Sequence, residues 1–572
     1  MKLSYNLNRY LLLCLLGVNT SLFAQVKTEE KKPQEEKPKA AVTEEVEVVR
    51  SYKPILADAV KIRRNPDLNE KKVFNPKVKY NPIDKKLELD SEIGALEAQK
   101  LIKQDEETLY NNFAKFGMGN LGSTLGALHI GTDRDEALQA GFNFNHWANS
   151  NGTLNKQKMS EQSIGAYGRS IGDNIVLDGK LNYNRRSNYF YGVNPEDANF
   201  NLDPKKQRFN LFEGDGLIYN RIDPNDMDKF AYAAKINGYI FNNIFEGKET
   251  GVALSGGLSK NLNKFQIGAN GLLDFTTSKD FAYSLDNHIF KVNPFIKLDG
   301  EKFKLTAGIN YIAEFGTNSN SNLFPNASID FSLVKNYLGL FAKLDGNVNK
   351  TRLKDLSYVN PFINENIDIR NQIEKFNISG GIKGTLAANI GYKAYISYKN
   401  IDNFAYFVND TTRRETFNLE YESGNTSVFG ITGELNIKFS DIARIDSKLE
   451  LNQYTLKHEL NAWQHPSAKL TTNASFKIAK KVKLDADLYF QGPTKAKLYE
   501  PDPTSSTVPA PLIGNIKTLK SFADLGVGAE YLYNKRISAF LRVNNLFNSD
   551  YQRYLYYPSY GFNILGGISY GF

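Results

Sequence analysis

The feature that most constrains this 572-residue chain is a two-residue alternation of apolar and polar side chains that recurs from about residue 112 onward. Successive side chains of a β-strand point to opposite faces of its sheet. Counting back from Phe572, the alternate residues are Tyr570, Ile568, Gly566, Ile564, Phe562 and Tyr560, whereas the residues between them are mostly small or polar. The C-terminal segment is therefore predicted to be a strand with one apolar face, aromatic at both ends, and one wet face.

The same alternation recurs upstream in runs of roughly ten residues, the length that a tilted strand needs to cross a membrane. Clear examples are 303–314, 482–490 and 523–531, with Ile312 as the one exception. A soluble β-sandwich has shorter strands, and strands in lipid must close on themselves because every backbone group needs a partner there. The sequence thus predicts an all-β fold over 112–572, a large antiparallel transmembrane β-barrel of about 22 strands.

Turn-rich inserts between these runs predict long extracellular loops, and short joints predict periplasmic turns. The predicted long loops are 186–207, 316–324, 351–372 and 492–513, and the predicted turns are 479–481 and 534–536. The loops are rich in aromatic residues, for example Tyr189 to Tyr191 and Tyr551 to Tyr557. These rings can stack on a ligand in the lumen, but we favour an outer aromatic girdle for most of them.

The N-terminus has the pattern of an export signal. A basic start at Lys2 and Arg9 precedes the apolar run Tyr10 to Val18, and Ala24 offers a small residue at the cleavage point. The run is too short to span a bilayer of roughly 30 Å, so residues 1–24 are predicted to be a cleaved signal peptide. Cys14, the only cysteine, falls within it, so the mature chain is expected to contain no thiol.

Two segments precede the predicted barrel. Residues 25–45 are mostly Lys, Glu, Pro and Ala and bury too little apolar surface to offset the entropy of ordering, so they are predicted to form a disordered charged leader. Residues 46–111 are predicted to form a mostly irregular periplasmic or lumenal segment. It contains one short helix at 91–110, where Ile93, Leu96, Leu101 and Leu109 recur at helical spacing.

Composition narrows the functional classes. The chain is 41% hydrophobic and its mean hydropathy is -0.44, which excludes a bundle of membrane-spanning helices. The net charge of +8 arises from 71 basic and 63 acidic residues scattered along the strands. Scattered charge is typical of a wet lumen and solvated loops, so no nucleic-acid partner is expected.

Three motifs that could carry chemistry are better explained by barrel architecture. Gly117 to Gly122 matches the dinucleotide fingerprint G-x-G-x-x-G but is followed by an extended segment instead of a helix. Gly567 to Gly571 spells G-x-S-x-G, yet the chain ends where the catalytic Asp and His should follow. The five histidines form no H-x-x-x-H pair. We therefore expect no enzyme activity, no catalytic or metal-binding residues and no cofactor.

The C-terminus resembles that of TonB-dependent receptors. The resemblance rests on Val543 to Asn548 (V-N-N-L-F-N), Tyr551 and the alternating strand that ends at Phe572. In that family, the terminal aromatic residue and its alternating neighbours form a signal for the barrel-assembly machinery. The resemblance therefore implies this role for Phe572, Tyr570 and Ile568.

Glu44 to Val49 is similar to the TonB box of the same family, a short strand that pairs with the energy-transducing protein TonB. The resemblance implies that Val46, Val48 and Val49 bind TonB or another periplasmic protein through 46–60. Two features depart from the family. Gly561 is followed by Phe562 where the family has a P-G-R pattern, and 25–111 is shorter than a standard plug domain of roughly 120 residues.

The sequence thus predicts a receptor-like barrel in contact with outer-membrane lipid, with its N-terminal segment in the periplasm. The leading hypothesis is passage or uptake of a ligand across the outer membrane. The alternative is a non-transporting barrel that serves as a subunit or scaffold of an assembly or secretion complex.

Overall fold

A computed structural model describes residues 111–572, except 133–136, 198–199, 223–228, 441, 480, 502–503, 506 and 508–511. The predicted signal peptide, charged leader and helix at 91–110 lie outside the described residues. So do Val46, Val48 and Val49.

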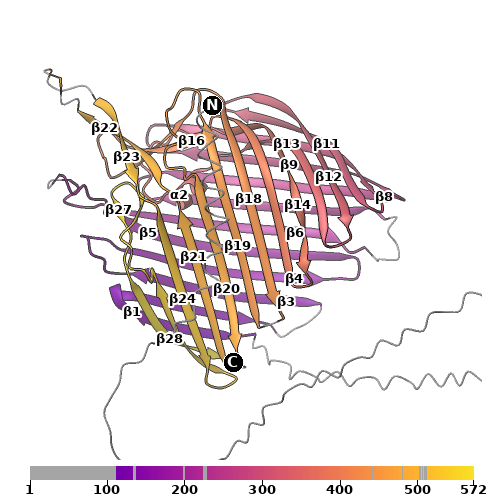
Figure 1. Ribbon diagram of the computed structural model, residues 1–572, viewed down its shortest axis with the longest axis horizontal. Coiled ribbons are helices and arrows are strands. Elements are labelled where there is room, and N and C mark those ends of the chain that lie inside the picture. Colours follow the sequence, from indigo (N-terminus) through magenta and orange to yellow (C-terminus); the bar gives the residue numbers. More distant parts are fainter. Residues whose placement is uncertain are drawn as a thin grey trace, which may run out of the picture. The chain divides into compact units, whose positions relative to one another are not determined.

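The described residues form a closed antiparallel barrel of 22 strands (Figure 1). Each barrel strand pairs with the next one along the chain, and the last strand, β28, pairs with the first, β1, to complete the ring. The predicted fold class and strand count are confirmed. The register is continuous across the closure, where Phe113 lies opposite Gly571 and Gly119 lies opposite Leu565.

The first half of the barrel consists of β1 (Phe113–Gly119), β2 (Ser123–Gly131), β3 (Leu138–Asn149), β4 (Met159–Ile171), β5 (Ile175–Tyr189), β6 (Lys206–Asn220), β7 (Ala231–Asn243), β8 (Lys248–Leu262), β9 (Phe265–Lys279), β10 (Ser284–Asp299) and β11 (Phe303–Gly316). The second half consists of β12 (Asn320–Val334), β13 (Leu338–Asn349), β14 (Gln372–Ala387), β15 (Ile390–Asp402), β18 (Thr426–Phe439), β19 (Ala443–Thr455), β20 (Ala468–Ile478), β21 (Val482–Gln491), β24 (Phe522–Leu532), β25 (Ile537–Asn544) and β28 (Asn563–Gly571).

Smaller elements lie in the connections. The 3-10 turn η1 (Asn120–Gly122) joins the first two strands, and the helix α2 (Leu353–Val359) follows β13. Three hairpins are formed by β16 (Ala405–Asn409) with β17 (Phe417–Tyr421), β22 (Thr494–Pro501) with β23 (Leu512–Leu519), and β26 (Gln552–Tyr554) with β27 (Tyr557–Pro558). Among the described residues, no helix is long and apolar enough to cross a membrane.

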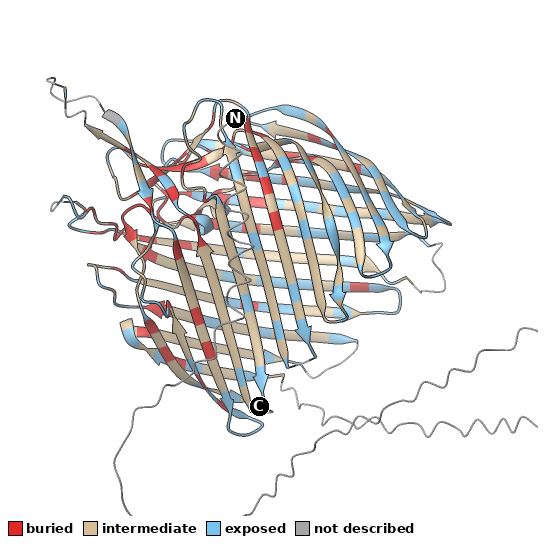
Figure 2. Ribbon diagram, in the orientation of Figure 1, coloured by how far each residue is buried: buried red, intermediate tan, exposed pale blue. Residues whose placement is uncertain are grey.

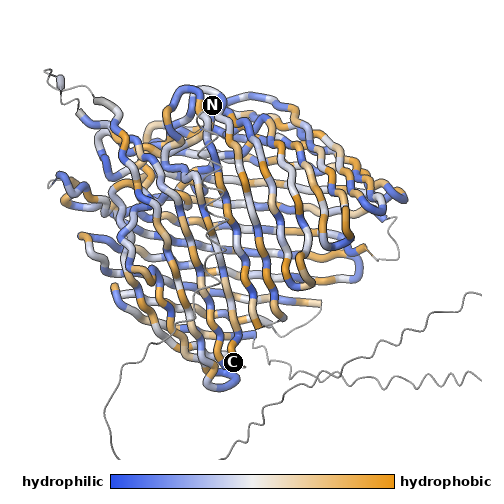
Figure 3. Tube along the Cα trace, viewed as in Figure 1, coloured by the Kyte–Doolittle hydropathy of each residue, from blue (hydrophilic) through white to orange (hydrophobic). Residues whose placement is uncertain are grey.

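The two faces of the wall differ as the alternation predicts, and Figure 3 shows hydrophobic and hydrophilic residues alternating along the strands. On β28, Ile568 and Tyr570 point outward and are exposed, whereas Asn563 and Leu565 point inward and are buried. Ile312, the exception to the alternation, is fully buried on the inner face against Ile289, Phe324 and Val348. An apolar residue at an inward position therefore marks a packed cluster inside the barrel.

The barrel has two unlike rims. The described chain enters at Asn111 and ends at Phe572 on the same rim, which we call the terminal rim, and most of the joints there are short, as at 479–481 and 533–536. The long connections lie on the opposite rim, which we call the loop rim. The prediction of a long loop at 316–324 is wrong, because Asn320 already pairs with Glu314 and leaves a joint of only three residues, 317–319. The Asn and Ser residues of this segment are typical of loops, but here most of them lie in β12.

Glycines of both motifs lie at the seam where β28 meets β1. Gly117 lies directly opposite Gly567, and the Phe540 ring lies so close to both that a Cβ on either glycine would approach Phe540 Cζ to 2.8 or 2.6 Å. The Lys115 ammonium lies over the same ring, 3.9 Å from its centroid. Gly122 has a positive φ of 59° in η1, a conformation that glycine adopts at no steric cost. These glycines thus permit strand closure and a tight turn.

Candidate functional site: a loop cap across the barrel mouth

The loops of the loop rim fold over the mouth of the barrel and share a buried core. We call this structure the cap; it is built from the loops 190–205, 350–371, 403–425 and 545–562 together with inward-facing residues of the wall. Figure 2 shows buried segments gathered around α2 and β16. The core consists of Phe190, Tyr191, Phe209, Tyr239, Phe241, Leu353, Phe362, Ile363, Ile367, Ile369, Phe407, Phe417, Leu419, Tyr554 and Tyr557.

Aromatic contacts show that the cap crosses the mouth. Tyr557, from the loop before β28, stacks on Phe362 with 3.5 Å between ring centroids. It also contacts Tyr191 after β5 at 5.0 Å and Phe417 after β15 at 6.1 Å. Because β5 and β15 lie on nearly opposite sides of a 22-stranded ring, one continuous core joins opposite walls.

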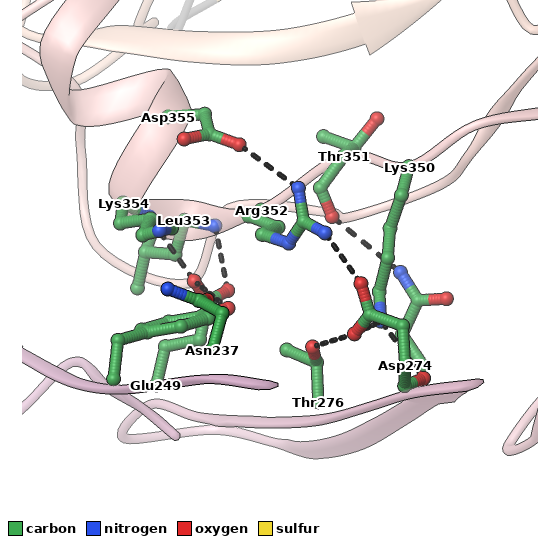
Figure 4. Close-up of polar contacts among 12 residues, drawn as sticks. Asn237, Glu249, Asp274, Thr276, Lys350, Thr351, Arg352, Leu353, Lys354 and Asp355 are labelled. Carbon is green, nitrogen blue, oxygen red and sulfur yellow. Dashed lines mark hydrogen bonds and ion pairs between the residues drawn. The ribbon is translucent and has the colours of Figure 1, made fainter. Parts of the chain in front are cut away.

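Helix α2 begins on a carboxylate that the wall supplies (Figure 4). The first backbone N–H groups of a helix have no partner within the helix. Here the N–H of Leu353 donates to Glu249 Oε2 at 2.7 Å and that of Lys354 donates to Oε1 at 3.3 Å. Tyr239 and Ser278 donate their hydroxyls to the same carboxylate at 3.0 and 2.8 Å. Glu249 is buried and fully engaged, so it holds α2 against the inner wall.

The residues just before α2 are held by a second wall carboxylate, Asp274 on β9. Lys350 Nζ and Arg352 Nη2 each lie 2.5 Å from it, on different carboxylate oxygens, and Thr276 donates to it at 3.0 Å. Asp274 is 2% exposed and the side chain of Lys350 is 5% exposed. We call Glu249, Asp274, Lys350 and Arg352 the latch, because the two wall carboxylates bind backbone N–H groups and cations of the cap.

Further contacts hold the rest of α2 on the neighbouring strands. Lys354 pairs with Glu213 of β6 at 3.2 Å and lies over the Tyr239 ring at 4.0 Å. Arg186 of β5 donates to the carbonyl of Ser357, and its guanidinium lies over the rings of Phe209 and Tyr358. Tyr554 donates its hydroxyl to the carbonyl of Val359 at 2.5 Å. Opening the cap therefore requires all of these contacts to break or to move together.

The protonation of Lys350 gives the cap an expected pH dependence. Burial lowers the pKa of Lys350 from 10.5 to about 8, because desolvation of the ammonium outweighs its hydrogen bond and charge interaction with Asp274. Opening the cap hydrates Lys350 and restores its ordinary pKa, so the open state binds more protons between pH 8 and 10.5. Raising the pH through this window therefore stabilises the closed cap, by up to about 1.4 kcal/mol per unit for this group.

This dependence can be measured by the swelling of liposomes that contain the purified protein, in a solution of a small sugar. Swelling by the wild-type protein is expected to slow as the pH rises from 8 to 9.5. In Lys350→Met, which lacks the titrating group, the slope should disappear. Wild-type swelling that accelerates over this range would contradict the assignment.

The sequence located the cap loops at 186–207 and 351–372 and the aromatic loop segment 551–557, but neither the loop 403–425 nor the latch. The preference for an outer aromatic girdle is wrong for Tyr191, Tyr554 and Tyr557, which are buried in the cap core. Asp274, Glu249 and α2 were not predicted. The available signal was the series of cations at Lys350, Arg352 and Lys354, which alternate at the start of a loop that follows a barrel strand.

The residues assigned by family resemblance to barrel assembly lie at the terminal rim. Ile568, Tyr570 and Phe572 are exposed on the outer face, and the rings of Tyr570 and Phe572 stack with 5.9 Å between centroids. This position leaves them accessible from outside the barrel wall. Within the described residues, no group of three or more His, Cys, Asp or Glu side chains is arranged to hold a metal ion.

The described residues thus form a closed 22-stranded barrel with an apolar outer face and loops folded into its mouth. The barrel has the fold of the TonB-dependent receptors, as the C-terminal residues predict. No protein-family model matches the chain, and no curated protein matches it in sequence. The likeness to known proteins is therefore a likeness of structure.

Three solved structures illustrate this likeness. The ferric-catecholate import receptor Fiu of E. coli K12 has a TM-score of 0.59 and 11% identity, over 81% of this chain and 82% of that one. The FrpB iron transporter of Neisseria meningitidis has a TM-score of 0.59 and 12% identity, over 81% of each chain. The pyoverdine receptor FpvA of Pseudomonas aeruginosa has a TM-score of 0.59 and 10% identity, over 81% of this chain and 78% of that one.

Proposed function

We propose that this protein is an outer-membrane receptor-like barrel that admits a ligand from the cell exterior when its cap opens. The observation that carries the proposal is the cap itself, whose core joins opposite walls and whose latch faces the lumen. A receptor needs a mouth that is closed at rest and can change state on binding. The segment at the start of α2 is suited to such a change, because discrete charge contacts join it to the wall and these contacts can exchange partners.

The proposal includes an orientation. The apolar outer face lies in lipid, and the loop rim faces the exterior. The terminal rim faces the periplasm, because the charged leader and the segment 46–111 join the barrel there. Val46, Val48 and Val49 would then be placed to pair with TonB or another periplasmic protein by strand addition.

Replacement of the helix-bearing segment tests passage directly. We expect that replacing 353–370 by a short Gly-Ser linker removes α2 and opens the mouth, so that liposomes containing the variant swell faster in arabinose. The matched control replaces the turn at 388–389, which lies on the terminal rim and makes no part of the cap. A faster rate in the cap variant alone supports passage through the lumen. Unchanged swelling in both variants would favour the scaffold hypothesis, in which the barrel does not conduct.

Binding of TonB through 46–60 needs a separate measurement. The full chain and a variant lacking 26–60 are compared for capture of the periplasmic domain of TonB. Loss of capture with unchanged swelling supports the partner-binding role of Val46, Val48 and Val49. Equal capture by both proteins would contradict it and leave passive passage standing.

A further inference from the structure

A groove runs along the outer face of the wall between β8 and β11, away from the cap. It has a volume of about 740 Å³ and an almost entirely apolar lining. Its floor is formed by the short side chains of Ala269, Pro294 and Ala307. Its walls are formed by the longer side chains of Leu258, Ile267, Ile296 and Ile309.

The strand register explains why the wall is hollow here. One row across the strands places Leu258, Ala269, Pro294 and Ile309 side by side, and the next row places Lys260, Ile267, Ile296 and Ala307 side by side. Each row thus has short side chains among long ones. Because the short members of the two rows are offset, the hollow runs obliquely across three strands as a channel, which suits a narrow, flexible chain.

A cation lines the β8 edge of this groove, near the terminal rim. Lys260 is the residue of the second row on β8, close to the end of that strand at Leu262. Its ammonium lies 5.0 Å from the centre of the Phe230 ring, which is 60% exposed. A lysine beside an exposed aromatic ring at the edge of an apolar belt is placed at the depth of lipid headgroups.

We propose that the groove binds one acyl chain of an anionic phospholipid whose phosphate contacts Lys260. The inference rests on the proposed membrane location of the outer face. The apolar channel matches a hydrocarbon chain, and the ammonium at its β8 edge matches the phosphate of the lipid headgroup. The terminal rim selects the leaflet, which is the periplasmic leaflet in the orientation given above.

Native mass spectrometry of the purified full chain in detergent tests the proposal, with palmitoyl-oleoyl phosphatidylglycerol and phosphatidylcholine as probes. The wild-type protein is expected to retain phosphatidylglycerol in preference. Lys260→Gln should weaken the binding of phosphatidylglycerol by about fivefold, as expected for the loss of one cation near a lipid phosphate. Ala307→Phe fills the channel and should abolish retention of both lipids.

The controls make the same changes elsewhere on the outer face. Ala342→Phe adds an aromatic ring to exposed Ala342 on β13, and Lys248→Gln removes an exposed charge at the loop-rim end of β8. Both should bind lipid as the wild-type protein does. Equal retention of the two lipids, or no change in Lys260→Gln and Ala307→Phe, would overturn the proposal. Membrane fractionation of the same variants tests the membrane location separately. If the protein is not a membrane protein, the wild type and every variant should be absent from the membrane fraction.

Discussion

Asp274→Asn is expected to release the cap while leaving the barrel closed. The substitution keeps the shape of the side chain but leaves Lys350 and Arg352 facing a neutral group in a buried site. Breaking a buried ion pair by removing one partner costs roughly 3–5 kcal/mol. Each 1.4 kcal/mol changes the ratio of open to closed protein about tenfold. The population of the open state should therefore rise by at least about a hundredfold. Limited trypsin digestion measures this rise, because the side chains of Lys350 and Lys354 are only 5% and 14% exposed in the closed cap.

Two variants define the scale of this effect. Asp330→Asn makes the same change in an ion pair with Lys383 whose side chains are 41% and 45% exposed, so a loss of at most about 1 kcal/mol is expected. Lys350→Met should not open the cap, since it removes a cation that burial disfavours and Arg352 remains paired with Asp274. Equal digestion of Asp274→Asn and Asp330→Asn would show that the latch does not hold the cap.

Gly567→Val is expected to prevent closure of the barrel. A Cβ at this position would lie 2.1 Å from the carbonyl oxygen of Phe116 and 2.6 Å from Cα of Gly117. Backbone atoms cannot give way as a flexible side chain can, so β28 and β1 must separate. Unpaired strand edges are not tolerated in lipid. The variant should therefore lose the heat-dependent shift in gel mobility that marks a closed barrel.

Gly433→Val is the matched control, because nothing lies within 4 Å of a Cβ built at that position of β18. It should retain the mobility shift. Phe572→Ala separates closure from the proposed assembly signal, since the exposed ring of Phe572 can be removed without a clash. That variant should reach the membrane in smaller amounts but migrate as a closed barrel. A normal mobility shift in Gly567→Val would contradict the seam geometry.

The barrel could be predicted because the pattern that specifies it lies within each strand. A strand between lipid and water must alternate at every step, and the sequence near Phe572 shows that alternation without reference to the rest of the chain. Ile312 shows how far the rule extends. It broke the pattern, and its burial with Phe324 and Val348 gives the physical reason, since a third environment exists inside the barrel.

The cap could not be predicted because the contacts that hold it join residues far apart in the sequence. Asp274 binds Lys350 and Arg352 across 76 and 78 residues, and Glu249 meets the start of α2 across 104. Polar, aromatic loops have the same composition whether they extend into solvent or fold inward. Only the register of β8 and β9, which points both carboxylates into the lumen near the loop rim, distinguishes the two outcomes.

The division of charge in the latch bears on which molecules can open it. The wall supplies anions and the cap segment supplies cations, so a solute that carries its own carboxylate or phosphate would be able to take the place of Asp274 beside Lys350 and Arg352. The cap would then open by exchange of one counterion for another, and neither Lys350 nor Arg352 would be left buried without a counterion. Neutral solutes have no such route, and a mouth built in this way would discriminate by charge before it discriminates by shape.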